Sequence, residues 1–346
     1  MGFAMNAVSI LAVVFICLLG VFALAALAMF VIDRTQTQDA IRRNYPVLGR
    51  FRHLFSSLGE FFRQYFFAMD REELPFNRAQ REWIARACAG VTNTVAFGST
   101  RNTAVPGTPI FVNAAFPPLN DQYASSEPML IGPTARVPYN APSFFNISGM
   151  SYGALSRPAV TALSRGAREA GIWLNTGEGG LSPFHLDGGC DVVFQIGTAK
   201  YGVRDAEGNL SDARLKELAE LPQVKMFELK LAQGAKPGKG GILPAAKVNA
   251  EISEIRGIPE GTASISPNRH PEIASYDDLL DMVARVRQVS GKPVGIKTVA
   301  GSEVALREMF LNFAARPDDV PDFITIDGGE GGTGAAPMPF IDLVGL

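Results

Sequence analysis

The sequence contains few cysteines and almost no net charge. Its three cysteines, Cys17, Cys88 and Cys190, are widely separated and none belongs to a CxxC pair. The sequence therefore indicates neither a disulfide framework nor a cysteine metal site. The 32 lysines and arginines nearly balance 34 aspartates and glutamates, which gives no indication of nucleic acid as a partner. With 346 residues, the chain can hold one large domain or two ordinary ones.

One long hydrophobic run lies near the N-terminus, and no lysine or arginine precedes it. Residues 7–32 are apolar apart from Ser9 and Gly20, and as a helix they would span about 39 Å, against about 30 Å for a hydrocarbon core. A cleaved signal peptide would have a basic start and a shorter apolar region. Because arginines follow from Arg34 onward, we expect a transmembrane anchor over residues 1–33, with the bulk of the chain in the cytoplasm. The alternative, a buried hairpin, is disfavoured by this length.

Residues 34–141 contain helical patterns but no catalytic constellation. Aromatic and leucine residues recur at three- and four-residue steps over 48–67, as on one face of a helix. This stretch could lie in a membrane interface or pack on the rest of the protein. Another helix is predicted over 77–91, and the following segment is rich in proline and turns. We predict a mostly helical covering subdomain.

From residue 142 onward, strand and helix signals alternate. Six short apolar runs each end in a polar or glycine-rich tip, at 144–147, 172–174, 192–196, 225–231, 294–299 and 323–326. Helices are predicted to begin at Ser156, at Ser302 and at Ser275, which forms a capping box with Asp278, and another is predicted over 212–220. Repeated βα units with chemistry at the carboxyl ends of the strands indicate a (β/α)8 barrel or a doubly wound sheet.

The stretch at 227–244, FELKLAQGAKPGKGGILP, is the most informative of these tips. A short alternating run leads into nine residues, 233–241, with four glycines and two lysines. Glycines let backbone N–H groups approach a ligand and lysines supply positive charge, so this segment suits an anion-facing loop. A solvated turn is the competing interpretation.

Six segments in order resemble the FMN-binding domain of glutamate synthase, and more closely its smaller, single-domain, membrane-anchored members. They are ISGMSYGALS (147–156), NTGEGG (175–180), KLAQGAKPGKGG (230–241), ISPNRH (265–270), GIKTV (295–299) and GGEGGTGA (328–335). The resemblance covers 142–346 and implies a TIM barrel with about six of its eight units. We therefore expect a C-terminally truncated chain that is inactive alone. The family's iron–sulfur cysteines lie beyond this point, so a cluster is expected only in a longer protein.

The resemblance assigns a set of residues to FMN. Ser148, Gly149 and Met150 would form a shelf under the ring, and Thr176 would contact it from the second strand. Gln233 would contact the pyrimidine edge, and Lys297 would place a positive charge beside N1. Gly331, Gly332 and Thr333 would form the loop at the ribityl phosphate. A lysine that ends a buried strand is costly unless it is paired, which favours a functional role for Lys297.

The resemblance also assigns a substrate site. Lys236 and Arg256 match residues that bind the two carboxylates of 2-oxoglutarate, and Glu178 matches the site acid. Glu178 and Lys236 are the candidate catalytic residues. The implied reaction is reductive amination of 2-oxoglutarate, through 2-iminoglutarate, to L-glutamate.

Two departures from the family pattern leave alternatives open. Ile242 stands where the family often has a substrate-site glutamine, so another 2-oxo acid or amino acid could be the substrate. The resemblance does not extend to a glutaminase domain, so we expect ammonia to come from a separate subunit or from solution. Alternative functions are a membrane-linked flavin amino-acid dehydrogenase and a non-catalytic membrane-tethered subunit.

Overall fold

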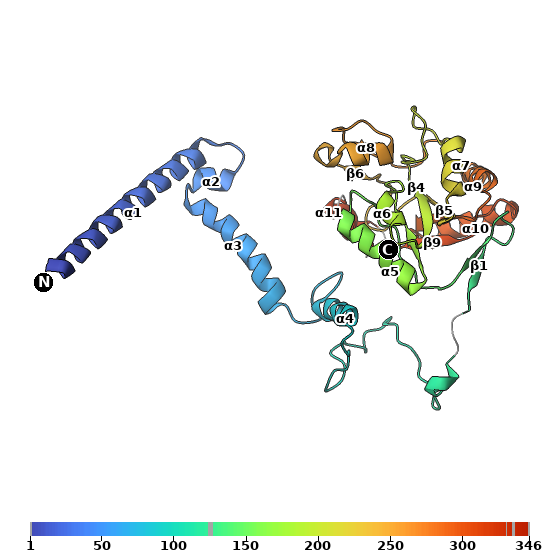
Figure 1. The fold of residues 1–346 in the computed structure, drawn as a ribbon, viewed down its shortest axis with the longest axis horizontal. Helices are drawn as coiled ribbons and strands as arrows, with labels where there is room; N and C mark the ends of the chain where they lie inside the picture. The colour runs from blue at the N-terminus through green and yellow to red at the C-terminus, as the bar shows by residue number, and fades with distance from the viewer. Residues whose placement is uncertain (1, 124–126, 330, 334–335, 345–346) are drawn as a thin grey trace. The chain divides into compact units, whose positions relative to one another are not determined.

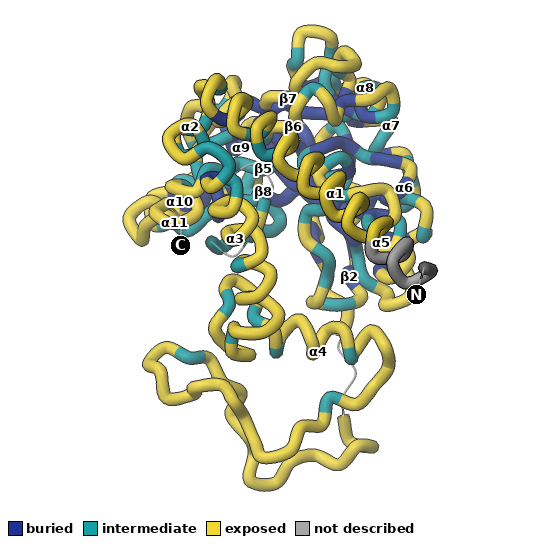
Figure 2. Tube along the Cα trace, turned by 90° about the vertical axis from the view of Figure 1, so that its left-hand side faces the viewer, coloured by how far each residue is buried: buried dark blue, intermediate teal, exposed yellow. Residues whose placement is uncertain are grey.

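The computed structural model describes residues 2–123, 127–329, 331–333 and 336–344. Contacts between residues divide the chain into two compact units, Met1–Ala115 and Phe116–Leu346, and each is described by itself. Figure 2 shows the dark blue of buried residues almost entirely in the second unit. The extended hydrophobic core therefore lies in the second unit.

The first unit is built from helices whose apolar side chains are largely exposed. It contains α1 (Gly2–Thr35), α2 (Ala40–Asn44), α3 (Leu48–Phe62) with a π-helical turn over Arg63–Phe67, and α4 (Arg78–Cys88). These bounds confirm the helices predicted over 48–67 and 77–91. The span Ser9–Thr35 of α1 is long and apolar enough to cross a membrane. An anchoring role for α1 stays a prediction.

The second unit is organised around five parallel strands in the order β3-β4-β5-β8-β9 (Figure 1). Their bounds are Trp173–Asn175, Asp191–Ile196, Val224–Lys230, Val294–Val299 and Ile324–Asp327. The strand order follows the chain without reversal, whereas a doubly wound sheet reverses at a switch point. This α/β fold with a curled parallel sheet fits a partial TIM barrel.

The first predicted strand, 144–147, is wrong as a full strand. Only Ile147 bridges to Leu174 of β3, and Phe144 and Phe145 are exposed. The physical reason is local, because the Ser143 hydroxyl accepts from the Phe145 N–H and the Asn146 side chain donates to the Ser143 carbonyl. These bonds hold 143–146 in a turn, and the sheet has five strands rather than six.

The helices predicted after Ser156, over 212–220, after Ser275 and after Ser302 form as α5 (Arg157–Ala170), α7 (Asp212–Glu220), α9 (Tyr276–Ser290) and α10 (Glu303–Ala315). The structure also contains α6 (Pro183–Leu186), α8 (Ala250–Arg256) and α11 (Met338–Leu343). The capping box of α9 forms between Ser275 and Asp278, and Ser302 caps α10. The main core joins side chains of β4, β5 and β8, such as Phe227, to buried residues of α7, α9 and α10, such as Leu280.

Small antiparallel pairs complete the unit and leave one end of the sheet for the site. The hairpin of β1 (Met129–Ile131) and β2 (Tyr139–Ala141) packs on Val193 and Met226. The Tyr139 hydroxyl donates to Asp191 at the start of β4, 2.8 Å away. The hairpin therefore lies at the amino ends of the strands. A second pair, β6 (Ile242–Leu243) with β7 (Ser264–Ile265), follows the loop after β5.

Candidate active site

A buried ion pair lies where β3 and β5 end. The Lys230 ammonium at the last residue of β5 is 2.8 Å from Glu178 Oε1 and also donates to Gln233 Oε1 at 2.7 Å. The side chains of Lys230 and Glu178 are only 12% and 19% exposed. Gly197, at the end of β4, lies directly under Glu178, since a Cβ there would be 2.6 Å from the Glu178 Cβ. The close packing fixes the carboxylate over the sheet.

Two further cations are buried around the same carboxylate. Lys236 is 2% exposed and donates to its own loop at the Gly240 carbonyl, 3.0 Å away. Arg256, at the end of α8, is 7% exposed, donates to Ser264 and lies over the Tyr201 ring. Neither cation forms an ion pair with any residue that the structure describes. Three cations thus surround one carboxylate, which leaves two positive charges uncompensated.

This surplus of positive charge shifts the ionisation of the cluster. Burial would raise the pKa of Glu178, but the nearby charges of Lys230, Lys236 and Arg256 outweigh it, so its pKa lies below the usual value. Burial lowers the pKa of Lys236 and of Arg256 in spite of the attraction of Glu178. Glu178 is therefore a carboxylate at neutral pH. A bound anion would relieve the cost of the buried cations.

A second ion pair lies at the neighbouring strand tips. The Lys297 ammonium is 3.4 Å from Asp327 Oδ2, and the same oxygen accepts from the Gly234 N–H at 3.0 Å. Gly234 fits only because it has no side chain, since a Cβ would be 1.8 Å from the Gly328 carbonyl oxygen. This contact fixes the loop after β5 to the end of β9, so that Gln233 and Lys297 lie at the same end of the sheet.

The backbone at 148–150 lies close to the tip of β3. The Met150 N–H donates to the Asn175 carbonyl at 3.0 Å, and a Cβ on Gly149 would be 3.2 Å from the Gly177 Cα. Ser148 is exposed. Thr176 is fully buried, and its hydroxyl donates to the Gly177 carbonyl. These contacts bring the segment to the carboxyl end of the sheet.

Gly331, Gly332 and Thr333 are described, although residues 330, 334 and 335 of the same predicted loop lie outside the described residues. A Cβ on Gly331 would be 2.5 Å from Asp327 Oδ1. The segment thus begins beside the Lys297–Asp327 pair. Apart from Arg256, which ends α8, the residues predicted for flavin and substrate lie near strand ends or in the segments that follow them, and their individual roles stay predictions.

A buried carboxylate that the sequence analysis missed lies beneath the site. Glu228 of β5 is 2% exposed and accepts from the side-chain amides of Asn175 at 2.9 Å and Gln195 at 2.6 Å, and from the Thr325 hydroxyl at 2.6 Å. The side-chain oxygen of Asn175, Oδ1, in turn accepts from the Gly177 N–H. Glu228 therefore joins four strands and holds the loop that carries Glu178. The sequence could have indicated Glu228, because polar and apolar residues alternate along β5 and this alternation places Glu228 and Lys230 on one face of the strand.

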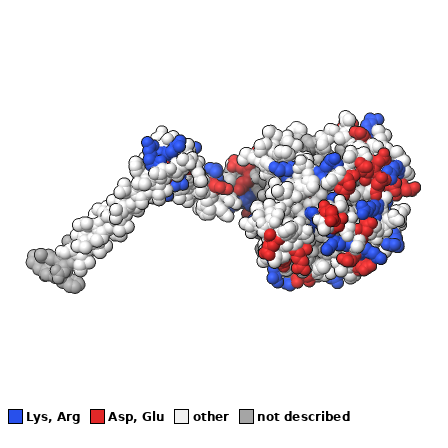
Figure 3. Space-filling view, turned by 90° about the horizontal axis from the view of Figure 1, so that it is seen from above, with Lys and Arg blue, Asp and Glu red and all other residues white. Residues whose placement is uncertain are grey.

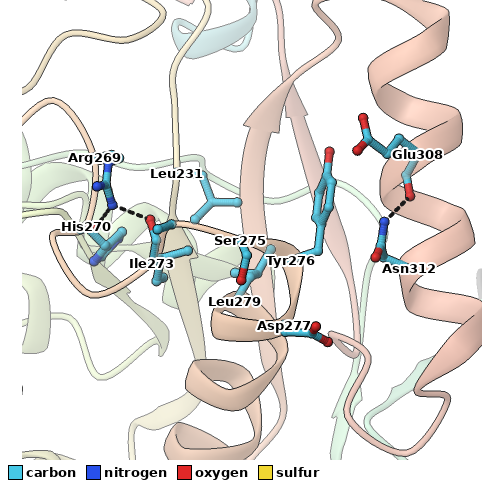
Figure 4. Close-up of a pocket in the computed structure, with 11 residues that line it drawn as sticks. Leu231, Arg269, His270, Ile273, Ser275, Tyr276, Asp277, Leu279, Glu308 and Asn312 are labelled. Atoms are coloured by element: carbon cyan, nitrogen blue, oxygen red, sulfur yellow. Dashed lines mark hydrogen bonds between the residues drawn. The ribbon is translucent and has the colours of Figure 1, made fainter.

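A larger cavity adjoins the site, because Leu231 lines both it and the pocket at Glu178 and Lys230. A cavity of about 600 Å³ lies between the loop before α9 and helices α9 and α10, lined by residues such as Leu231, Tyr276 and Glu308 (Figure 4). Arg269 at its edge donates to the Ile273 carbonyl. The pocket at Glu178 and Lys230 has only about 10 Å³, room for about one water molecule. A substrate there requires movement of the 236–241 loop.

Comparisons with known proteins agree in identifying one family. A sequence profile described as "Conserved region in glutamate synthase" matches residues 122–346. The glutamate synthase large subunit-like protein YerD of Bacillus subtilis (strain 168) is 38% identical over 92% of this chain and 67% of its own length. The archaeal-type glutamate synthase [NADPH] of Thermotoga sp. (strain RQ2) is 38% identical over 58% of this chain and 36% of its own length. The archaeal glutamate synthase [NADPH] of Methanocaldococcus jannaschii is 37% identical with the same coverage of each chain.

Proposed function

Because the chain belongs to the glutamate synthase family, we propose that it carries the part of an oxidoreductase that forms L-glutamate from 2-oxoglutarate and ammonia on FMN. The chain spans 67% of YerD and 36% of the archaeal-type relatives. The activity of those proteins as wholes is therefore part of the proposal. The domain division is proposed with it, as an anchor over 1–33, a covering subdomain over 34–141 and the FMN domain over 142–346.

The observation that carries the proposal is the uncompensated charge around Glu178. The buried Lys236 and Arg256 and the largely buried Lys230 supply three positive charges against one carboxylate. A diacid such as 2-oxoglutarate has two negative charges and would neutralise this surplus. Carboxylates bound to buried cations form strong, charge-assisted hydrogen bonds. The charge of the site thus favours a dicarboxylate over a neutral ligand.

Glu178 is proposed to move protons during the amination. Ammonia adds to the 2-oxo carbon, water leaves to give the imine, and a hydride and a proton then give the amino acid. Because its pKa is held low by the surrounding cations, Glu178 begins as a carboxylate and accepts a proton from the attacking nitrogen. Lys230, 2.8 Å away, stabilises the carboxylate between transfers.

The side chains at the other strand tips fit the ring end of a flavin. Gly149 provides backbone without a side chain, Gln233 an amide for the pyrimidine edge, and Lys297 a positive charge near Asp327. When bound, the flavin would supply the hydride for the reduction. Lys297 would stabilise negative charge on the reduced ring. Gly331, Gly332 and Thr333 are proposed for the phosphate end.

The nitrogen and electron sources are proposed to lie outside the described site. Ammonia would come from a glutaminase subunit or from solution, and the electrons from a donor subunit. The printed names of the archaeal-type relatives include NADPH, which makes NADPH the first donor to test.

The candidate span Ser9–Thr35 supports a single-pass membrane protein with its barrel domain in the cytoplasm. It also favours a second candidate function, an amino-acid dehydrogenase that passes electrons to a membrane acceptor.

One experiment tests both directions of the reaction. Full-length protein loaded with FMN is mixed without oxygen in two arms: chemically reduced protein with 2-oxoglutarate and ammonium, and oxidised protein with L-glutamate. The proposal expects flavin reoxidation with glutamate formation in the first arm, abolished in Glu178→Gln. Reduction by glutamate alone would establish the dehydrogenase instead. Failure of the full-length protein to retain flavin would refute both and leave the non-catalytic subunit.

A further inference from the structure

Helix α3 and the turn that follows it have one apolar face and one polar face. At 100° per residue, an arc of about 120° holds Phe51, Leu54, Phe55, Leu58, Phe61 and Phe62, which we call the apolar face. The opposite side has serine, glutamate and arginine. The six side chains of the apolar face are 40% to 65% exposed. No described residue of the first unit covers this face.

Positive charge surrounds the apolar face. Residues 33–67 contain six arginines against three acidic residues. Arg52 and Arg63 lie on the polar side of α3 and form no ion pair with any described residue. Figure 3 shows the described part of α1 without charge until its last turn, and a cluster of lysine or arginine side chains where it turns into α2. The charge around the apolar face is complementary to an anionic lipid surface.

A buried carboxylate joins the start of α3 to the end of α1. Asp33 is completely buried and accepts from Arg42 and from Arg50 at the start of α3. It also accepts from the Val47 N–H at 3.0 Å. Because Asp33 ends the apolar run of α1, α3 begins where α1 would leave a hydrocarbon core. Aromatic side chains are enriched at that depth.

We propose that α3 lies in the surface of an anionic membrane, with its apolar face in the acyl boundary and its arginines among lipid phosphates. Phenylalanine dominates the face, which is typical of interfacial helices, whereas the seam of a coiled coil favours leucine, isoleucine and valine. The Asp33 cluster then holds the interfacial helix at a fixed point beside α1. The proposal goes beyond the activity proposed above and does not depend on it.

The test measures the surroundings of the two faces in the full-length protein. Spin labels are attached one at a time to Phe55→Cys and Phe62→Cys, or to Ser57→Cys and Gln64→Cys on the opposite face. The background contains Cys17→Ser and Cys88→Ser, and Cys190 is buried. The protein is inserted into phosphatidylcholine vesicles with phosphatidylglycerol. Collision rates with oxygen, which is concentrated in lipid, and with a water-soluble nickel chelate are then measured.

The proposal expects labels at 55 and 62 to collide with oxygen and not with nickel, and labels at 57 and 64 to do the reverse. Leu58→Glu with Phe62→Glu should move the label at 55 into water, whereas Ser57→Glu with Gln64→Glu, which adds the same charge to the other face, should not. Omitting phosphatidylglycerol should reduce the depth at 55. Protection of the label at 55 from both reagents would show that protein covers the face and would overturn the proposal. Free access of nickel to it would do the same.

Discussion

Replacing Lys236 by methionine should stabilise the protein and abolish diacid binding. The lysine is 2% exposed, and Glu178, the acid near it, is already bonded to Lys230 at 2.8 Å. Methionine retains most of the aliphatic stem and removes the charge. The variant therefore separates what Lys236 contributes to folding from what it contributes to binding.

The magnitude follows from two opposing terms. Loss of the hydrogen bond to the Gly240 carbonyl costs about 1–2 kcal/mol. Relief from burying an ammonium without its own carboxylate is worth several kcal/mol, as for other buried charges. We expect a net stabilisation of about 2 kcal/mol, which for a domain of this size raises the melting temperature by ~4–8 °C.

The difference between the variant and the original protein should depend on pH in a defined direction. Burial lowers the pKa of Lys236 from its ordinary value of 10.5. Between the lowered pKa and 10.5 the unfolded chain binds a proton that the folded protein does not, so the original protein gains stability as pH rises. Lys236→Met lacks this group. Its advantage is therefore largest at low pH and shrinks as pH rises toward 10.5.

The assay is thermal unfolding of the full-length protein in detergent, with and without 2-oxoglutarate, over a range of pH. Lys239→Met is the matched control, because Lys239 belongs to the same loop but is only half-buried and should change stability little. 2-Oxoglutarate should raise the melting temperature of the original protein and of the control, but not of Lys236→Met. A destabilised Lys236→Met, or one that 2-oxoglutarate still stabilises, would refute the reasoning.

Three further substitutions test the rest of the site. Glu228→Ala leaves the buried amides of Asn175 and Gln195 and the partly buried Thr325 hydroxyl without their acceptor and should lower the unfolding free energy by about 3–5 kcal/mol. Glu228→Gln should cost about 1–2 kcal/mol, and equal losses in denaturant titrations would contradict these hydrogen bonds. Gly234→Ala places a Cβ 1.8 Å from the Gly328 carbonyl and should cost about 1–3 kcal/mol, and an unchanged melting temperature would show that the loop is elsewhere. Lys297→Ala should weaken flavin binding and make its reduction potential more negative, so unchanged flavin content and potential would count against its role.

Two helices that begin with a side-chain cap lie where the sequence predicts them. The helix predicted over 212–220 is α7 at the same bounds, and α9 begins at the predicted capping box. In both helices, the capping residue and the spacing of the apolar residues are consistent with the same start of the helix. The strand predicted at 144–147 was wrong because side chains of Ser143 and Asn146 bond to the backbone locally, and such competition is not visible in an apolar pattern.

The sequence analysis proposed residues in the loops that follow strands, and Lys297 of β8 through the family resemblance, but it missed Glu228 and Lys230 inside β5. Lys236 and Gln233 come from a glycine-rich loop, which a pattern indicates directly. Glu228 and Lys230 alternate with apolar residues in β5, so they are also compatible with the solvated face of an ordinary sheet. That face is enclosed only when the sheet curls. The curvature depends on the whole strand order rather than on β5 alone.

Glu178 and Lys236 are held in different ways, which has different consequences for ligand selection. Glu228 fixes Asn175, and Asn175 fixes the Gly177 N–H, so Glu178 is held from below by the sheet itself. Lys236 is bonded within its own loop, to Gly240, and can move with that loop when a ligand enters. The Glu178 carboxylate is thus held in one position, whereas the loop that carries Lys236 can adjust to a ligand. Ile242 follows Gly241, where a Cβ would be 3.0 Å from Glu178 Oε1, and it is 41% exposed. Exchange of an apolar for an amide side chain there would change the loop and leave Glu178 in place, so it should alter ligand selection without loss of the proposed proton-transfer group.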